Sequence, residues 1–74
     1  MIGDELRKAR DDAKMTQEQL SFAAGIDRTY ISQLEHNKKS PTVEVLFRLC
    51  KALGVAASEI IARVERTSKP SSKK

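Results

Sequence analysis

Apolar side chains recur every three to four residues along most of this chain, which is the spacing that places them on one face of an α-helix. Over about residues 2–14, Ile2, Leu6, Ala9 and Ala13 share such a face, and charged residues fill the positions between them. This pattern predicts an amphipathic first helix whose apolar face packs on a core.

Two short helices joined by a tight turn are predicted between Thr16 and Glu35. Thr16 and Gln19 have the spacing of a capping box, in which side chain and backbone satisfy each other at a helix start. Gly25 suits the position just past a helix end, where a positive backbone φ is common. Asp27 can cap the next helix, because its carboxylate accepts hydrogen bonds from free backbone N–H groups. These residues predict a helix-turn-helix.

A fourth helix is predicted after residues 40–42. Thr42 is a suitable cap for it, and Pro41 keeps the preceding residue out of the helical region. Its main apolar stripe consists of Val43, Leu46, Phe47, Cys50 and Leu53. Val45 and Leu49 lie on another side, and a helix that is apolar on two sides is central to a core or part of an interface.

The last predicted helix covers about residues 57–65, where Ala57, Ile60, Ile61 and Val64 fall on one side. The chain therefore contains five predicted helices. Its 74 residues are enough for one small core. The expected fold is a single all-α domain.

The helix over about Asp27–His36 has an apolar side, formed by Ile31 and Leu34, and a polar side. The polar side spans about 140° and consists of Arg28, Thr29, Ser32, Gln33 and His36. Arginine can bond the O6 and N7 atoms of guanine, glutamine can bond adenine in a similar way, and serine or threonine can bond either base. A polar side turned to solvent is the commoner explanation for such a helix. The side chains alone leave both interpretations open.

The stretch from Thr16 to Glu35 resembles the helix-turn-helix of the lambdoid phage repressors and Cro proteins, and more broadly that of the Xre family of bacterial regulators. The matching positions are Gln17, Leu20, Gly25, Ile31 and Leu34, together with Arg10, Pro41 and Ala52-Leu53-Gly54-Val55 outside the motif. The run DRTYIS at residues 27–32 is also similar to the controller proteins of restriction–modification systems. The resemblance implies a five-helix, lambda-repressor-like DNA-binding domain with the helix-turn-helix in its second and third helices.

This family resemblance implies a transcriptional regulator whose third helix enters the major groove of double-stranded DNA. The residues expected to contact base edges are Arg28, Thr29, Ser32 and Gln33, with Arg28 reading a guanine. The residues expected to contact phosphates are Gln17, Tyr30, Asn37, Lys38, Lys39, Ser40 and Thr42. Tyr30 is explained equally well as a core residue with a hydrated hydroxyl group.

A dimer on a (pseudo)palindromic operator is expected, because one recognition helix reads only a few base pairs. The residues expected at the dimer interface are Val45, Leu49, Val55, Ile60, Ile61 and Val64. The alternative is that these side chains fill the monomer's own core.

Arg10 borders the apolar face of the first helix, where a charged group needs a partner. In the family, the matching arginine bonds a glutamate that corresponds to Glu35. The resemblance therefore implies a structural ion pair between Arg10 and Glu35.

The net charge changes this picture little. Lys69, Lys73 and Lys74 contribute three positive charges to the net charge of +4, so residues 1–66 carry only +1. Residues 1–66 are the expected DNA-binding domain, and residues 67–74 are an expected flexible basic tail, polar and interrupted by proline. The composition of this tail favours a solubilising end over an arm that touches DNA.

Other function classes find little support in the composition. One histidine and one cysteine form neither a zinc motif nor a catalytic set, so no enzyme, cofactor or metal is predicted. The absence of a long apolar run and of a signal peptide predicts a cytoplasmic, nucleoid-associated protein with no membrane partner. An antitoxin or adaptor that uses this scaffold for protein contacts is the alternative, and RNA polymerase is a further candidate partner.

Overall fold

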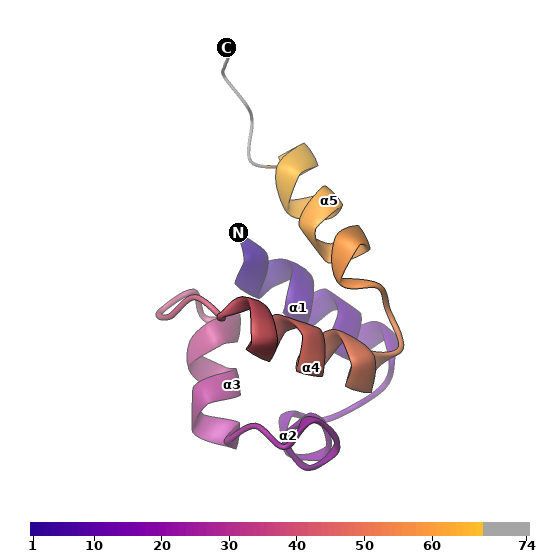
Figure 1. Cartoon of the computed structure of the whole chain (residues 1–74). Coiled ribbons are helices and arrows are strands. Elements are labelled where there is room, and N and C mark those ends of the chain that lie inside the picture. The colour runs from indigo at the N-terminus through magenta and orange to yellow at the C-terminus, as the bar shows by residue number, and fades with distance from the viewer. Residues whose placement is uncertain (68–74) are drawn as a thin grey trace.

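The computed structural model describes residues 1–67. In this range the chain forms five helices and no strand: α1 (Ile2–Asp12), α2 (Gln17–Ala24), α3 (Arg28–Glu35), α4 (Val43–Leu53) and α5 (Ala57–Thr67). Figure 1 shows α2 and α3 together at one end of the molecule and α5 at the other. α1 packs against α3 and α5, and α2 packs against α3 and α4. The predicted all-α, five-helix architecture is confirmed.

The ends of α2 and α3 form through the predicted local contacts. The Gln19 backbone N–H donates to Thr16 Oγ1 at 3.0 Å, and the Thr16 backbone N–H donates to Gln19 Oε1 at 2.8 Å, which completes a capping box. Gly25 ends α2 with a left-handed φ of 69°. The Asp27 carboxylate then accepts the backbone N–H of Thr29 at 3.0 Å. The turn of the motif is therefore set by contacts between residues close in sequence.

Apolar side chains from all five helices meet in one core. Its buried members are Leu6, Ala9, Leu20, Ile26, Ile31, Leu34, Leu46, Leu49, Cys50, Leu53 and Ile60. Burial raises the pKa of the Cys50 thiol, so this group stays protonated near neutral pH and behaves as a small apolar side chain. None of the helices in the described range is long and apolar enough to cross a membrane.

The orientation of α4 differs from the predicted one. Val43 and Phe47, expected in the main apolar stripe, are 68% and 58% exposed. Leu49, expected on another side, is 1% exposed. The buried side is formed by Leu46, Leu49, Cys50 and Leu53. These positions have the complete i, i+3, i+4, i+7 spacing of one helix face, which explains why this side faces the core.

Two predicted boundaries shift by a few residues. α1 ends at Asp12 instead of near Lys14, because Lys14 adopts a left-handed φ of 58° that no α-helix continues. Ala13, expected on the buried face of α1, is exposed. Thr67, expected to begin the tail, belongs to α5, and its hydroxyl donates to the carbonyl oxygen of Arg63 at 3.0 Å. The rest of the predicted basic tail, residues 68–74, lies outside the described residues.

The orientation of α4 is tested by two truncations. Leu49→Ala should lower the free energy of unfolding by about 2–5 kcal/mol, because it leaves a cavity in the core. Phe47→Ala removes a larger but mostly exposed side chain and should cost less than about 1 kcal/mol. Urea unfolding of both variants measures the difference. A larger loss for Phe47→Ala than for Leu49→Ala would contradict an α4 whose Leu49 side faces the core.

Candidate nucleic-acid interface

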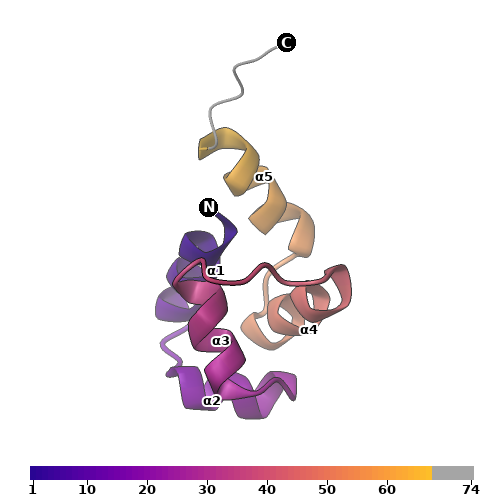
Figure 2. The same cartoon turned by 90° about the vertical axis from the view of Figure 1, so that its left-hand side faces the viewer.

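The apolar side of α3 packs into the core, so its opposite side lies at the surface. Ile31 and Leu34 are each 1% exposed, so their side chains hold the helix against its neighbours. Figure 2 shows α3 toward the viewer, with α2 below it. Of the four predicted base contacts, Arg28 and Thr29 are exposed, and Ser32 and Gln33 are half-buried. None of the four is buried.

Arg28 lies beside the first turn of α2. An open depression between the two helices of the motif is lined by Arg10, Met15, Thr16, Gln17, Glu18 and Arg28. A residue predicted to read a base and one predicted to lie at the phosphates, Arg28 and Gln17, therefore meet at one surface. Glu18 adds a negative charge beside them, a feature that the helical pattern did not single out.

The loop from α3 to α4 carries most of the predicted phosphate contacts. Lys38, Lys39, Ser40 and Thr42 are all exposed. Thr42 also caps α4, because its Oγ1 accepts the backbone N–H of Val45 at 3.1 Å.

Tyr30 packs as the core interpretation expected, and its contact with a phosphate stays a prediction. Its ring is half-buried and packs against the core, while its hydroxyl donates to the Ser40 carbonyl oxygen at 3.5 Å. The side chain thus connects the core to the loop that bears the lysines.

Two residues predicted to contact phosphates form side-chain hydrogen bonds within the chain. Gln17 Nε2 donates to Glu35 Oε1 at 3.0 Å. Asn37 Oδ1 accepts the backbone N–H of Gly3 at 3.1 Å, and Asn37 Nδ2 donates to Asp4 Oδ1 at 3.3 Å. Their amide groups are therefore engaged with neighbouring helices before any ligand is present.

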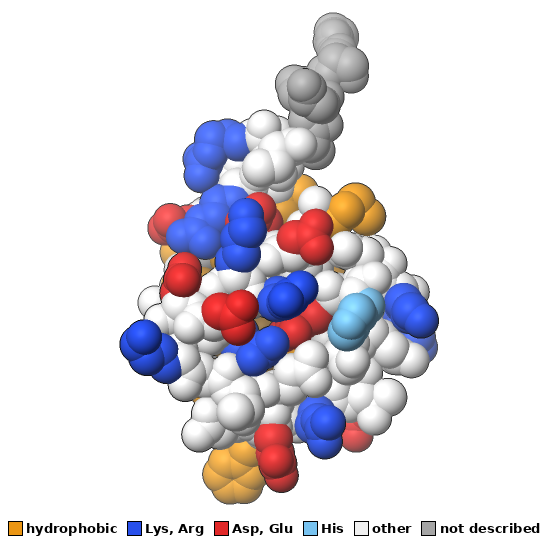
Figure 3. Space-filling view, turned by 180° about the vertical axis from the view of Figure 1, so that it is seen from behind, with side chains coloured by type: hydrophobic (Ala, Val, Ile, Leu, Met, Phe, Trp, Pro, Cys, Tyr) orange, Lys and Arg blue, Asp and Glu red, His pale blue; other side chains and the backbone are white. Residues whose placement is uncertain are grey.

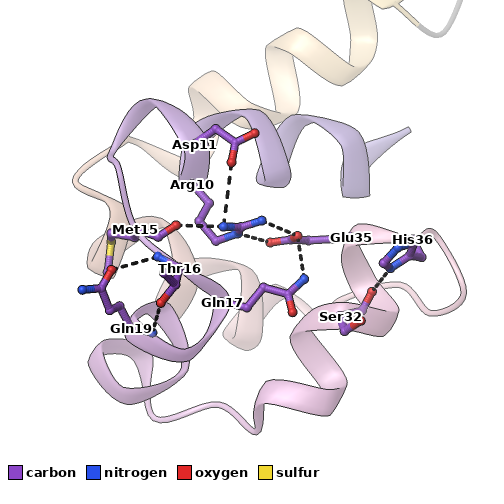
Figure 4. A network of polar contacts seen from close by, with 9 residues as sticks. All are labelled: Arg10, Asp11, Met15, Thr16, Gln17, Gln19, Ser32, Glu35 and His36. Carbon is purple, nitrogen blue, oxygen red and sulfur yellow. Dashed lines mark hydrogen bonds and ion pairs between the residues drawn. The ribbon is translucent and has the colours of Figure 1, made fainter.

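The expected ion pair between Arg10 and Glu35 is present and is bidentate (Figure 4). Arg10 Nε lies 2.7 Å from Glu35 Oε2, and Arg10 Nη2 lies 3.0 Å from Glu35 Oε1. The Glu35 side chain is 3% exposed and that of Arg10 is 13% exposed. The hydrogen bond to Glu35 raises the pKa of Arg10 despite the opposing effect of burial, and the attraction of Glu35 and Asp11 acts in the same direction. Arg10 is therefore charged at every ordinary pH.

Further bonds extend this pair into a network. Arg10 Nη1 donates to the carbonyl oxygen of Met15 at 2.8 Å and lies 3.8 Å from Asp11 Oδ1. With the bond from Gln17 to Glu35, the network joins α1, the segment before α2, the start of α2 and the end of α3. The family resemblance pointed to the Arg10–Glu35 pair, but the part of Gln17 and Met15 was missed because nothing in the local pattern signals it.

The predicted dimer interface is wrong for two residues. Leu49 and Ile60 are 1% and 0% exposed, and both side chains lie in the core of this chain. A side chain enclosed by its own molecule has no surface to offer a partner. The helical pattern of apolar residues on α4 and α5 does not show which of them are enclosed in the core.

The other predicted interface residues keep some exposure. Ile61 is exposed, and Val45, Val55 and Val64 are half-buried. Val43 and Phe47 on α4 are exposed as well, and they were missed because the helical pattern assigned them to the core. Apolar surface is thus available on both α4 and α5.

The chain carries charges of both signs on its surface. Figure 3 shows lysine and arginine side chains interspersed with aspartate and glutamate on the face seen from behind. Within residues 1–67 no group of histidine, cysteine, aspartate or glutamate side chains is arranged to hold a metal ion.

Comparison with known proteins identifies the motif. Residues 6–60 match the family model described as helix-turn-helix, which is more than half of the chain. The chain belongs to the helix-turn-helix family. The match and the fold confirm the expected family and the lambda-repressor-like, five-helix architecture.

Its relatives are regulators of gene expression. The chain is 31% identical to the uncharacterized HTH-type transcriptional regulator y4dJ of Sinorhizobium fredii, over 90% of this chain and 87% of that protein. It is 30% identical to the control protein C.SmaI of Serratia marcescens, over 85% of this chain and 75% of that protein. The crystal structure of the clp gene regulator ClgR from C. glutamicum superposes with a TM-score of 0.86 at 28% identity, covering 92% of this chain and 88% of that one.

The Arg10–Glu35 pair is tested by removing one partner. Arg10→Met should lower the free energy of unfolding by about 3–5 kcal/mol, because the buried Glu35 carboxylate loses its counter-charge. Arg48→Met is the matched control: it breaks an exposed pair with Glu44, 3.3 Å apart, and should cost about 0–1 kcal/mol. Thermal and denaturant unfolding measure both. An unchanged melting temperature for Arg10→Met would contradict a structural role for the pair.

Proposed function

We propose that this helix-turn-helix regulator binds double-stranded DNA as a homodimer and inserts α3 of each protomer into the major groove of a (pseudo)palindromic operator. The supporting observation is the construction of α3. Its apolar side is fixed by Ile31 and Leu34, its end is bound through Glu35, and its other side presents polar side chains of several lengths. A helix held in this way can present its hydrogen-bonding side chains to base edges without reordering.

The base edges would be read from the outer side of α3. Arg28 is exposed at the start of the helix, where a guanidinium can bond guanine O6 and N7 together. Thr29, Ser32 and Gln33 would add contacts to neighbouring bases along the same side. The relatives that are transcriptional regulators and control proteins favour such a role.

The loop after α3 would bind the phosphates. Lys38, Lys39, Ser40 and Thr42 are exposed next to the end of the recognition helix, and the Tyr30 hydroxyl lies at the same loop. Charged and hydroxyl groups at this position can set the orientation of the protein on the duplex without reading sequence. Gln17 would contribute to this surface mainly by holding α2 against Glu35.

Dimerisation would use the apolar surface of α4 and α5. The residues proposed for it are Val43, Phe47 and Ile61, which are exposed, with Val45, Val55 and Val64 at its margin. Two recognition helices related by a twofold axis would give the specificity that one helix of this length lacks. Such a protein would act in the cytoplasm, associated with the nucleoid. RNA polymerase stays a candidate partner.

An antitoxin or adaptor would use the same apolar surface for a different protein. The polar outer side of α3 favours DNA, because an adaptor has no use for Arg28, Thr29 and Gln33 on one accessible side. Gel-shift measurements against random duplex at low and high salt separate the two functions, since only the DNA-binding protein forms a complex that salt weakens.

Two variants test the division between base and phosphate contacts. Arg28→Ala should cost about 1–3 kcal/mol on the specific site and relax the preference at one base pair per half-site. Lys39→Ala should weaken binding to all sequences nearly equally and reduce the salt slope by about one unit per half-site. Titrations of specific and random duplexes at several salt concentrations measure both. Equal losses on the two duplexes for Arg28→Ala would overturn its role as a base reader.

A further inference from the structure

The first turn of α1 receives its cap from a distant part of the chain. Within the described residues, the N-cap Met1 forms no side-chain hydrogen bond to the helix. The second residue of the helix, Gly3, instead donates its backbone N–H to Asn37 Oδ1 at 3.1 Å. The side chain of an N-cap residue normally accepts a hydrogen bond from the backbone N–H of the second or third residue of its own helix. Here the acceptor lies 34 residues away, just after the recognition helix.

The contact is closely fitted. Gly3 is buried, and a Cβ atom at this position would overlap both the Leu34 carbonyl oxygen and Asn37 Oδ1. Only glycine therefore allows α1 to approach the end of α3 so closely. Asn37 has a left-handed φ of 60°, a conformation that asparagine tolerates better than most residues. Its Nδ2 also donates to Asp4 Oδ1 at 3.3 Å, so both ends of the amide are bound.

We propose that Asn37 is a positioning residue, which holds the loop bearing Lys38, Lys39 and Ser40 in the geometry that meets the DNA backbone, and does not itself act on a phosphate. This proposal rests on the proposed function. The contact that sets the geometry of the loop is the one between Asn37 and Gly3 and Asp4 in the first turn of α1.

The physical reason is the cost of ordering a charged loop. Lysine side chains and loop backbone lose conformational freedom when they engage a phosphate, and a loop that is already held in place loses less. At the far end of the loop, the Tyr30 hydroxyl bonds the Ser40 carbonyl oxygen at 3.5 Å, and Thr42 Oγ1 accepts the Val45 backbone N–H at 3.1 Å. At the near end, the backbone N–H groups of Asn37 and Lys38 bond carbonyl oxygens of α3 at 3.0 and 2.8 Å. The Asn37 amide connects this turn to α1.

Substitutions at Asn37 can separate positioning from direct contact. Asn37→Gly keeps the left-handed backbone accessible and removes both side-chain bonds. Asn37→Asp keeps an acceptor for the Gly3 N–H but places a carboxylate against that of Asp4. The double variant Asp4→Asn with Asn37→Asp exchanges donor and acceptor, restores both bonds and leaves the net charge as in the wild type.

The experiment measures the affinity of these variants for a duplex that the wild-type chain selects from a random pool, and for random duplex. Asn37→Gly should weaken binding to the selected duplex roughly fivefold, a change within the range of one capping hydrogen bond. Asn37→Asp should weaken it further, and the double variant should return close to the wild-type affinity. Ala9→Gly, which weakens α1 to a similar extent away from this contact and from the proposed dimer surface, should leave the affinity unchanged.

Three results would overturn the proposal. These are a double variant that binds as weakly as Asn37→Asp, an Asn37→Gly variant with wild-type affinity, and an equal loss in Ala9→Gly. The first would show that the residue meets a phosphate directly. Hydrogen exchange of the Gly3 amide in the free protein, expected to be faster in Asn37→Gly, tests the capping contact without DNA. If the wild-type chain selects no duplex, the proposed function fails and the positioning role with it, while the exchange rate still reports on the contact.

Discussion

The buried carboxylate of Glu35 is the constraint on which the geometry of the motif depends. A charge so fully removed from water is tolerated only when its oxygens are matched by donors. Arg10 supplies two donors and Gln17 supplies a third, and Arg10 is itself held by the Met15 carbonyl oxygen. Because these residues belong to three helices and a connecting segment, satisfying one carboxylate fixes the end of α3 against the rest of the domain.

This arrangement explains how so short a helix can be presented rigidly. α3 has eight residues, too few for a stable isolated helix, so its form and direction come from tertiary contacts. Asp27 caps its start, Ile31 and Leu34 seat one side in the core, and Glu35 binds its end. Just beyond, Asn37 contacts the first turn of α1. Anchoring at each of these points leaves the outer side chains to act from a preorganised frame.

The sequence predicted those features that depend on neighbouring residues. The capping box of Thr16 and Gln19 and the cap at Asp27 are local contacts with known spacings, so they could be predicted directly. The Arg10–Glu35 pair spans 25 residues and was reached only through the family resemblance.

Other features were hidden because periodicity does not say which apolar side faces inward. Val43–Leu53 contains overlapping apolar stripes, so Phe47 was assigned to the core and Leu49 to an interface, which the burial of Leu49 reverses. The contact of Asn37 with Gly3 left no trace in the pattern, because it joins a side chain to a backbone group of a distant helix. Tertiary packing decides both matters.

Selection of binding sites from a pool of random duplexes tests most directly whether α3 reads DNA as part of a dimer. We expect an enriched (pseudo)palindrome whose half-sites lie about 10–10.5 base pairs apart from centre to centre, the repeat of one helical turn. A pool with no enriched sequence, or with a single unrepeated half-site, would contradict DNA reading by a dimer.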